Sequence, residues 1–252
     1  MQLQDFFREN PVCAVAFSGG VDSAYLIYAA SAYGQRTAAY FVKTPFQPDF
    51  ELEDAQDVVR RLGMPLTVLE FDVLRIPAVA ANPENRCYHC KRALFTLLLE
   101  AANADGFSLV LDGCNASDDA SDRPGMKALR ELGIRSPLRE CGVTKSDIRR
   151  LAREADLPVW DKPSYACLAT RVPTGTAITR PDLARIARGE NLLASLGLSD
   201  FRLRLRDNNA LLQVRAEQIP LARQLLPEIQ TALAADFHEI VLDDTPRITR
   251  ET

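Results

Sequence analysis

The sequence predicts an α/β fold with a doubly wound parallel sheet, because short apolar runs alternate with helix-like segments up to Pro158. This alternation is typical of parallel strands whose connecting helices cover both faces of the sheet. After Pro158 a polar, glycine-containing stretch interrupts the pattern, and the segments that follow are typical of a small α+β unit. We therefore expect two domains, residues 1–175 and residues 176–252.

The expected strands are buried apolar runs, and the expected helices between them show a 3.6-residue periodicity. In the first domain the strands are 12–17, 37–42, 66–71 and 109–111, and the helices are 24–33, 52–62, 91–103 and 145–154. In the second, a helix from Pro181 to about Leu196 precedes strands at 201–206, 210–215 and 239–242, with a helical region that ends near Ala235. Because ligands bind beyond the carboxyl ends of parallel strands, a crevice is expected where loop 18–23, strand end 41–43 and turn 112–115 meet.

The segment from Phe17 to Ser23, FSGGVDS, joins the first expected strand to the first expected helix. A glycine turn at a helix start offers backbone N–H groups to a polyphosphate, and the serines add hydroxyl donors. The lysine-containing GxxxxGKS/T loop and the dinucleotide motif GxGxxG are both absent from the sequence. ATP is the expected ligand, and an ordinary capped helix is the alternative. The candidate ATP-binding residues are Ser18, Gly19, Gly20, Val21, Ser23, Phe41, Gly113 and Asn115.

Composition fits an enzyme better than a disordered or nucleic-acid-binding chain, with a net charge of −4 and an apolar fraction of 47%. No apolar run approaches the ~20 residues that cross a bilayer, and the first residues, MQLQD, lack the basic start of a signal peptide. We expect a cytoplasmic protein that binds neither membrane nor nucleic acid. Six cysteines are too sparse for a disulfide scaffold, so their spacing is better interpreted as metal or catalytic chemistry.

Cys87 and Cys90 form a CxxC at a helix start, for which four interpretations compete. A thioredoxin-like redox pair would belong on the first helix after a strand, and a structural zinc site lacks a second ligand pair. Inert core thiols and an iron–sulfur cluster with a third cysteine remain. That third cysteine is Cys167, whose neighbours Lys162 and Arg171 would raise its thiolate fraction for nucleophilic attack or metal binding. The other three cysteines, Cys13, Cys114 and Cys141, are expected to pack or to be incidental.

Five segments together resemble the ATP-dependent sacrificial sulfur transferases, the LarE family, which belongs to the PP-loop ATP pyrophosphatases. They are SGGVDS at 18–23, DGCNASD at 112–118, RPG at 123–125, TK at 144–145 and WDKPSYACLATRVPTGTAIT at 160–179. The resemblance implies a Rossmann-like (HUP) fold and adenylation of a carboxylate on pyridinium-3,5-biscarboxylic acid mononucleotide, with release of pyrophosphate. Sulfur delivery would then yield a thiocarboxylate for the nickel-pincer cofactor of lactate racemase.

The resemblance also implies roles for particular residues. Family members with one active-site cysteine surrender its sulfur and leave dehydroalanine, whereas three-cysteine members hold a [4Fe-4S] cluster whose open iron can bind a sulfide. Cys87, Cys90 and Cys167 match the second kind. Asp22 is expected to coordinate Mg²⁺ between the phosphates, while the Gly19 and Gly20 backbone holds the leaving pyrophosphate. Sulfide or an unidentified donor would resupply sulfur, and we expect a homo-oligomer.

Three arginines of the second domain, Arg202, Arg204 and Arg206, alternate along a strand and so share one face at ~6.8 Å intervals. They are expected to bind the substrate's phosphate, and a solvated sheet face is the alternative. The expected substrate-binding residues are Arg171, Arg204, Arg206 and Glu190. Glu190 falls where the resemblance implies an acid that contacts metal or substrate. A second such acid is replaced here by Gln213, which weakens the expectation of a metal site in this domain.

Three other functions stay open. A PP-loop tRNA thiolase would need a more basic surface than a net charge of −4 suggests. A nucleotide-binding regulator without catalysis would not need an intact Asp22 and Cys167. Amidation of the kind carried out by NAD or GMP synthetase does not require a CxxC.

Overall fold

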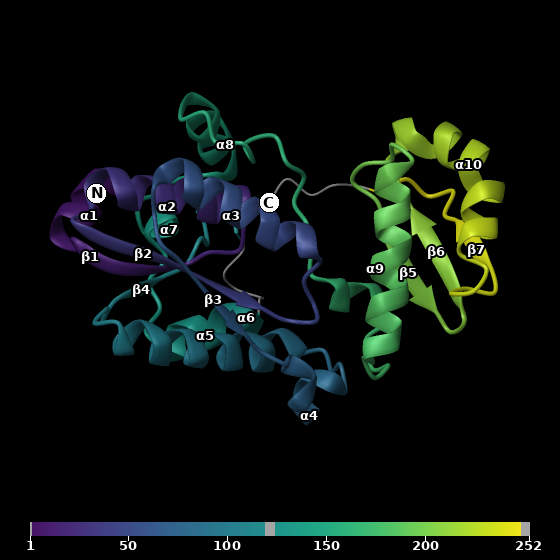
Figure 1. The fold of residues 1–252 in the computed structure, drawn as a ribbon, viewed down its shortest axis with the longest axis horizontal. Coiled ribbons are helices and arrows are strands. Elements are labelled where there is room, and N and C mark those ends of the chain that lie inside the picture. The colour runs from purple at the N-terminus through teal and green to yellow at the C-terminus, as the bar shows by residue number, and fades with distance from the viewer. Residues whose placement is uncertain (1, 119–123, 248–252) are drawn as a thin grey trace. The chain divides into compact units, whose positions relative to one another are not determined.

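The structure is a computed structural model that describes residues 2–118 and 124–247, and it divides into two units that we treat separately (Figure 1). Of the described residues, the N-terminal unit comprises those up to Arg75 and those from Asn85 to Lys162. The C-terminal unit comprises Ile76–Glu84 and the residues from Pro163 onwards. The short stretch Ile76–Glu84 therefore belongs with a much later part of the chain.

Four parallel strands form the sheet of the N-terminal unit, in the order β3-β2-β1-β4. They are β1 (Val12–Ala16), β2 (Arg36–Lys43), β3 (Leu66–Glu70) and β4 (Val110–Leu111). Each lies within one or two residues of an expected strand, because a strand buried on both faces appears in the sequence as a continuous apolar run. The predicted α/β fold class is confirmed.

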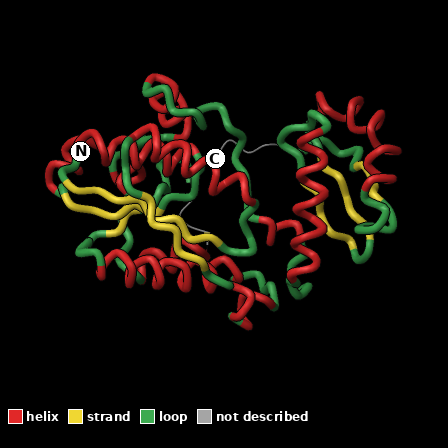
Figure 2. Tube along the Cα trace, viewed as in Figure 1, coloured by secondary structure: helices red, strands yellow, loops and turns green. Residues whose placement is uncertain are grey.

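Helices cover both faces of this sheet, as Figures 1 and 2 show. One face packs on α1 (Leu3–Glu9), α2 (Val21–Tyr33), α3 (Asp49–Leu62) and α8 (Lys145–Glu154), and the other packs on α5 (Arg86–Ala104) and α6 (Pro124–Glu131). Successive residues of β1 alternate between the two cores, because Cys13 and Val15 belong to the first and Ala14 to the second. The short segments η1 (Val73–Arg75) and α7 (Pro137–Glu140) complete the unit.

The C-terminal unit is a small α+β fold around a three-stranded sheet of order β5-β6-β7. Its elements are α4 (Pro77–Ala80), η2 (Leu168–Arg171), α9 (Arg180–Ser195), β5 (Arg202–Arg206), β6 (Asn209–Gln213), η3 (Ala216–Gln218), α10 (Ile219–Ala232) and β7 (Ile240–Leu242). Strands β5 and β6 are antiparallel, and β6 and β7 are parallel. Gly189 of α9 allows the helix to approach the sheet, since a Cβ there would lie 2.3 Å from Leu203.

Two backbone hydrogen bonds join the stretch Ile76–Glu84 to the rest of the C-terminal unit. Gly175 N–H donates to the Asn82 carbonyl and Ile178 N–H donates to the Ala80 carbonyl, each at 2.8 Å. In the described part of the chain, no helix is long and apolar enough to cross a membrane.

Candidate nucleotide site and the Cys167 loop

The glycine turn links the end of β1 at Ala16 to the start of α2 at Val21. Two serine hydroxyls brace it from within, because Ser23 Oγ accepts from the Ser18 N–H at 3.2 Å and lies 3.1 Å from Ser18 Oγ. Ser23 Oγ also donates to the Gly20 carbonyl at 3.1 Å. Gly20 is the N-cap of α2 and brings no side chain to the cap. The N–H groups of the first helical turn can therefore bond to an anionic ligand.

Close contacts favour glycine at two positions of this region, and at Gly19 the backbone conformation favours it as well. Gly19 has a φ of +78°, and a Cβ on it would lie 2.5 Å from the Glu51 carbonyl oxygen of α3. Gly113, in the turn after β4, would place a Cβ 3.0 Å from the Ser23 nitrogen. The backbone of the loop therefore packs closely against α3 and against the turn after β4. The opposite side of the loop can contact a ligand.

A pocket of about 370 Å³ opens at the carboxyl ends of β1, β2 and β4. This volume lies within the range of small-molecule sites. Its lining includes all three segments at which a crevice is expected, through Ser18, Gly20, Asp22 and Ser23 of the loop, Val42 of β2, and Asp112, Gly113 and Cys114 of the turn.

One face of α5 forms the other wall of the pocket. Lys91, Leu94, Phe95 and Leu98 all line it, and their spacing of three and four residues places them on one side of the helix. The pocket therefore combines a polar loop with an apolar wall, as a nucleotide with phosphates and a base requires. We did not predict Lys91 as a site residue, although this spacing is a signal that the sequence already carried.

The Asp22 carboxylate is the most unusual group in the pocket. Its Oδ2 accepts from Lys145 Nζ at 2.6 Å, while its Oδ1 is buried and accepts no hydrogen bond from any described residue. Burial raises the pKa of Asp22 above its ordinary value, and the Lys145 ammonium opposes that rise. A buried carboxylate oxygen that accepts no hydrogen bond is a suitable ligand for a hard cation, so Asp22 is suited to bind Mg²⁺.

Lys145 is a second residue that sequence reasoning did not assign to the site. Its side chain is only 8% exposed, and it enters the pocket region from the first turn of α8. The Thr144 and Asp147 capping box fixes the start of that helix and hence the direction of the lysine. The TK pair in the sequence was the signal, but its pairing with Asp22 spans 123 positions of the chain.

The remaining expected ATP-binding residues lie just behind the pocket. Val21 and Phe41 belong to the apolar core on the α2 side, whereas Tyr40 and Val42, the neighbours of Phe41, line the pocket. Asn115 is buried and shapes the turn, because its side chain accepts from the Ser117 N–H at 2.8 Å.

The six cysteines fall into distinct environments. Cys87, which is exposed, and Cys90, which is half-buried, share a face in the first turns of α5 in the N-terminal unit. Cys167 is half-buried at the N-cap of η2 in the C-terminal unit. Within either unit the described residues contain no group of three or more His, Cys, Asp or Glu side chains placed to hold a metal ion. The three-cysteine cluster therefore stays a prediction.

The other cysteines are held as thiols. Burial raises the pKa of Cys13 to about 12 inside β1. Cys114 donates to Asp112 Oδ2 at 2.8 Å, and burial followed by the Asp112 charge raises its pKa well above the usual range. Burial also raises the pKa of Cys141. Cys114 nevertheless lines the pocket, which its expected packing role did not include.

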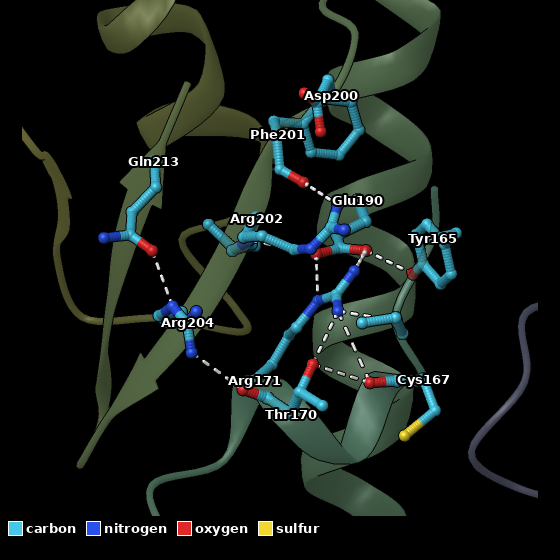
Figure 3. A network of polar contacts seen from close by, with 12 residues as sticks. Tyr165, Cys167, Thr170, Arg171, Glu190, Asp200, Phe201, Arg202, Arg204 and Gln213 are labelled. Atoms are coloured by element: carbon cyan, nitrogen blue, oxygen red, sulfur yellow. Dashed lines mark hydrogen bonds and ion pairs between the residues drawn. The ribbon is translucent and has the colours of Figure 1, made fainter. Parts of the chain in front are cut away.

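Arg171 and Glu190, both expected to contact substrate, bond to each other in the C-terminal unit (Figure 3). Arg171 Nε and NH2 donate to the two Glu190 oxygens at 2.7 and 2.9 Å, and the residues are 1% and 5% exposed. This bidentate geometry is the strongest form of a carboxylate–guanidinium pair.

The three arginines of β5 differ in exposure along the strand. Arg202 is buried and donates to the Phe201 and Ser164 carbonyls, and burial lowers its pKa to about 10. Arg204 is half-buried and donates to Gln213 Oε1 at 2.6 Å. Arg206 is exposed, and its side chain forms no hydrogen bond with the described residues. Exposure therefore increases from Arg202 to Arg206, and Arg206 is the most accessible of the three to a ligand.

Gln213 occupies the position where the resemblance implies an acid. It accepts from Arg204, and its Nε2 donates to Asp243 Oδ2 at 2.7 Å. An amide can serve a cation and a carboxylate at once, because it carries both an acceptor and a donor. Here Gln213 therefore bridges Arg204 and Asp243.

A parallel sheet with a glycine turn of sequence SGGVDS opens on a pocket lined by Lys91 and by Asp22, which Lys145 pairs with; together these features define a nucleotide-binding protein of the PP-loop class. Known proteins support this class. The chain is 38% identical to an uncharacterised protein of Synechocystis over 86% of its own length and 81% of that protein. It is 28% identical to the tRNA-specific 2-thiouridylase of Acidithiobacillus ferrooxidans over 58% of its length and half of that enzyme.

The chain is also 31% identical to the pyridinium-3,5-bisthiocarboxylic acid mononucleotide synthase of Lactiplantibacillus plantarum, across 81% of the chain and 75% of that enzyme. No model of a known protein family matches the chain. With this degree of identity over most of both chains, the protein belongs to the LarE family of the PP-loop superfamily. The resemblance seen in the sequence is thereby confirmed at the level of the family.

Proposed function

We propose that the protein is an ATP-dependent sulfurtransferase that forms AMP and pyrophosphate. It adenylates a carboxylate of pyridinium-3,5-biscarboxylic acid mononucleotide and exchanges one carboxylate oxygen for sulfur, in nickel-pincer cofactor synthesis. The observation that carries the proposal is the orphaned Oδ1 of Asp22 in a glycine-turn pocket. The membership in the LarE family supports the choice of substrate.

The two chemical steps explain why ATP is needed. A carboxylate is a poor acyl donor, so its oxygen first attacks the α-phosphorus of ATP, and the bond from that phosphorus to pyrophosphate breaks. A sulfur nucleophile then attacks the acyl carbon, and AMP leaves with the former carboxylate oxygen. The glycine-turn N–H groups and Lys145 would stabilise the charge that develops on pyrophosphate, while Asp22 would hold Mg²⁺.

The source of the sulfur has two versions. In the version we favour, Cys87, Cys90 and Cys167 hold a [4Fe-4S] cluster, which would supply a replaceable sulfide. In the sacrificial version, the Cys167 thiolate forms a thioester with the substrate. Loss of the Cys167 Cα proton then breaks its Cβ–S bond, leaving sulfur on the substrate and dehydroalanine at position 167.

Iron content and intact mass separate the two versions. If the cluster forms, the anaerobically reconstituted protein is brown, and Ser at position 87, 90 or 167 removes most of the iron while C141S keeps it. In the sacrificial version the protein is iron-free, C87S retains full activity, and one turnover leaves the chain lighter by one H₂S. A colourless protein whose C87S variant is fully active would overturn the cluster and leave sulfur transfer standing.

A tRNA thiolase is the second candidate, because the chain shares 28% identity with a tRNA-specific 2-thiouridylase. The net charge of −4 disfavours it. Retention of tRNA by the protein at physiological salt, with thiolation of a tRNA base, would favour this function over the small-molecule one. Release of pyrophosphate excludes a regulator without catalysis.

A further inference from the structure

A buried ion pair lies directly behind the loop that carries Cys167. Arg171 ends η2, only four residues after the cysteine, and its partner Glu190 is in the middle of α9. Both side chains are almost fully buried, at 0% and 5% exposure. An ion pair in such a place is costly to desolvate, and an apolar pair of similar size often stabilises a fold as well or better. Its presence here points to a geometric requirement.

The guanidinium of Arg171 also binds the backbone of the cysteine loop. Its NH1 donates to the Ala166 carbonyl at 2.7 Å and to Thr170 Oγ1 at 2.8 Å, with a longer bond of 3.4 Å to the Cys167 carbonyl. Thr170 Oγ1 in turn donates to the Cys167 carbonyl at 2.9 Å. Figure 3 shows that the Cys167 sulfur points away from this network while its carbonyl faces into it. The backbone that carries the Cys167 thiol is therefore held in place by hydrogen bonds from the Arg171 guanidinium.

Glu190 is fixed in place by two partners besides Arg171. The Leu203 N–H of β5 donates to Oε1 at 3.0 Å, and the Tyr165 hydroxyl donates to Oε2. The Tyr165 ring lies beneath the Arg171 guanidinium, 4.6 Å from centroid to Cζ. Four hydrogen bonds thus converge on the two oxygens of Glu190, and all four come from groups of the C-terminal unit. A carboxylate with this many donors is poorly suited to hold a metal or a substrate.

We propose that Arg171 and Glu190 are positioning residues for Cys167: Glu190 anchors Arg171, and Arg171 holds the loop carbonyls so that the Cys167 thiol is presented outward in one orientation. The proposal rests on the proposed function in one respect, that Cys167 handles the sulfur. It replaces the role expected from the sequence, in which both residues contact substrate directly. Arg204 supports the same loop, because its NH1 donates to the Thr170 carbonyl at 3.0 Å.

The rate at which iodoacetamide alkylates Cys167 tests this proposal without any sulfur-transfer assay. The full chain without added iron is sampled over time, and the peptides containing Cys167 and Cys87 are quantified by mass spectrometry. We expect E190Q to raise the Cys167 rate at least about tenfold, the change produced by loosening the loop by ~1.4 kcal/mol, and to leave the Cys87 rate unchanged. R171K should act likewise, because a single ammonium cannot reproduce the planar fork that binds carboxylate and carbonyls together.

R188Q is the matched control, since Arg188 lies on the same helix and pairs with Asp236 in an exposed bridge away from the loop. Its Cys167 rate should equal that of the unmodified chain. Circular dichroism shows whether each variant is folded. If E190Q and R171K are unfolded, T170V decides, because it removes only the hydroxyl that joins Arg171 to the Cys167 carbonyl, and we expect a rise of roughly threefold.

If E190Q is folded and its Cys167 is alkylated at the same rate as in the unmodified chain, the proposal is wrong. If E190Q is unfolded, the same result in T170V would overturn the proposal. A second readout separates positioning from a general loss of structure: pyrophosphate release should be unchanged in E190Q, while thiocarboxylate formation falls. If the unmodified chain forms no thiocarboxylate, the proposed function fails, and the alkylation rates still decide whether Arg171 and Glu190 position the loop.

Discussion

The polar groups of the two units differ in how completely they are satisfied. In the N-terminal unit the Asp22 carboxylate lies in a pocket with one buried oxygen that accepts nothing from the described residues. In the C-terminal unit the Glu190 carboxylate, which is 5% exposed against 27% for the Asp22 side chain, accepts four hydrogen bonds. Burying an unsatisfied polar atom costs free energy, so it persists where a ligand completes it. The contrast supports our two proposals, that Asp22 binds a ligand and that Glu190 supports the backbone of the Cys167 loop.

The largest effect is expected from D22N. An amide is a much weaker ligand for Mg²⁺ than a carboxylate, and we expect the rate of pyrophosphate release to fall by about 10²–10³. D57N is the control, because Asp57 forms only exposed ion pairs on α3. A pyrophosphate assay on both variants checks this, and a D22N rate within a factor of ~3 of the control would break the contrast, since that is under 1 kcal/mol.

The next effect is expected from G19A, with G20A as its matched neighbour. Alanine at position 19 must take a φ of +78° and meet the Glu51 carbonyl at 2.5 Å, whereas a Cβ at position 20 meets nothing nearer than 3.6 Å. We expect G19A to lower the free energy of unfolding by about 1–3 kcal/mol and to weaken ATP binding, and G20A to leave stability nearly unchanged. Urea denaturation and calorimetric ATP titration measure both. Equal stability of the two variants would argue against the loop geometry.

K145M tests the ion pair through its pH dependence. Burial already raises the pKa of Asp22, and loss of Lys145 raises it further. At low pH Asp22 is protonated in the folded and unfolded chain, so its charge costs nothing. As pH rises, the unfolded chain loses this proton first, and the folded chain becomes less stable until its own raised pKa is passed. The deficit of K145M should therefore grow from pH 4 to pH 7, reaching about 1–3 kcal/mol. A constant deficit in urea denaturation would contradict it.

R204A and R206A compare two arginines of different exposure on one strand, and their effect is expected on substrate binding and not on the ATP step. Loss of a charge-assisted bond to substrate phosphate, worth ~1.5–3 kcal/mol, should raise the substrate KM at least about tenfold in both. Only R204A should also lower the melting temperature, because Arg204 bonds to Gln213 and Thr170. Unchanged kinetics in both variants would show that neither arginine binds the substrate phosphate.

The sequence predicts the sheet closely and the helix starts less well. The apolar runs place all four strands of the N-terminal unit, whereas α5 begins at Arg86, five positions before the expected 91. Its first turn, Arg-Cys-Tyr-His-Cys, is polar, and Asn85 at the N-cap forms no side-chain cap bond, so no signal marked the start. Helix α1 was not predicted at all, although Phe6 and Phe7 are fully buried. Two neighbouring aromatics in a seven-residue helix show too little periodicity to identify it.

Some residues of the candidate site can be placed from a local motif, whereas others depend on tertiary packing. The glycine turn is local, so its motif alone places Ser18, Asp22 and Ser23 at a strand–helix junction. Two ion pairs, Lys145 with Asp22 and Arg171 with Glu190, depend on how helices pack. No local sequence pattern predicts either pair. For that reason Glu190 was expected to contact a ligand, and only the packed structure shows its oxygens bonded to protein groups.

The most direct test of the account is the fate of ATP when the protein is given pyridinium-3,5-biscarboxylic acid mononucleotide, Mg²⁺ and a sulfur source without oxygen. Chromatography of the nucleotides and mass spectrometry of the substrate are read from the same sample. We expect AMP and pyrophosphate in equal amounts, with thiocarboxylate formed in proportion to the AMP. ADP and phosphate as the main products, or AMP with no sulfur in the substrate, would contradict it.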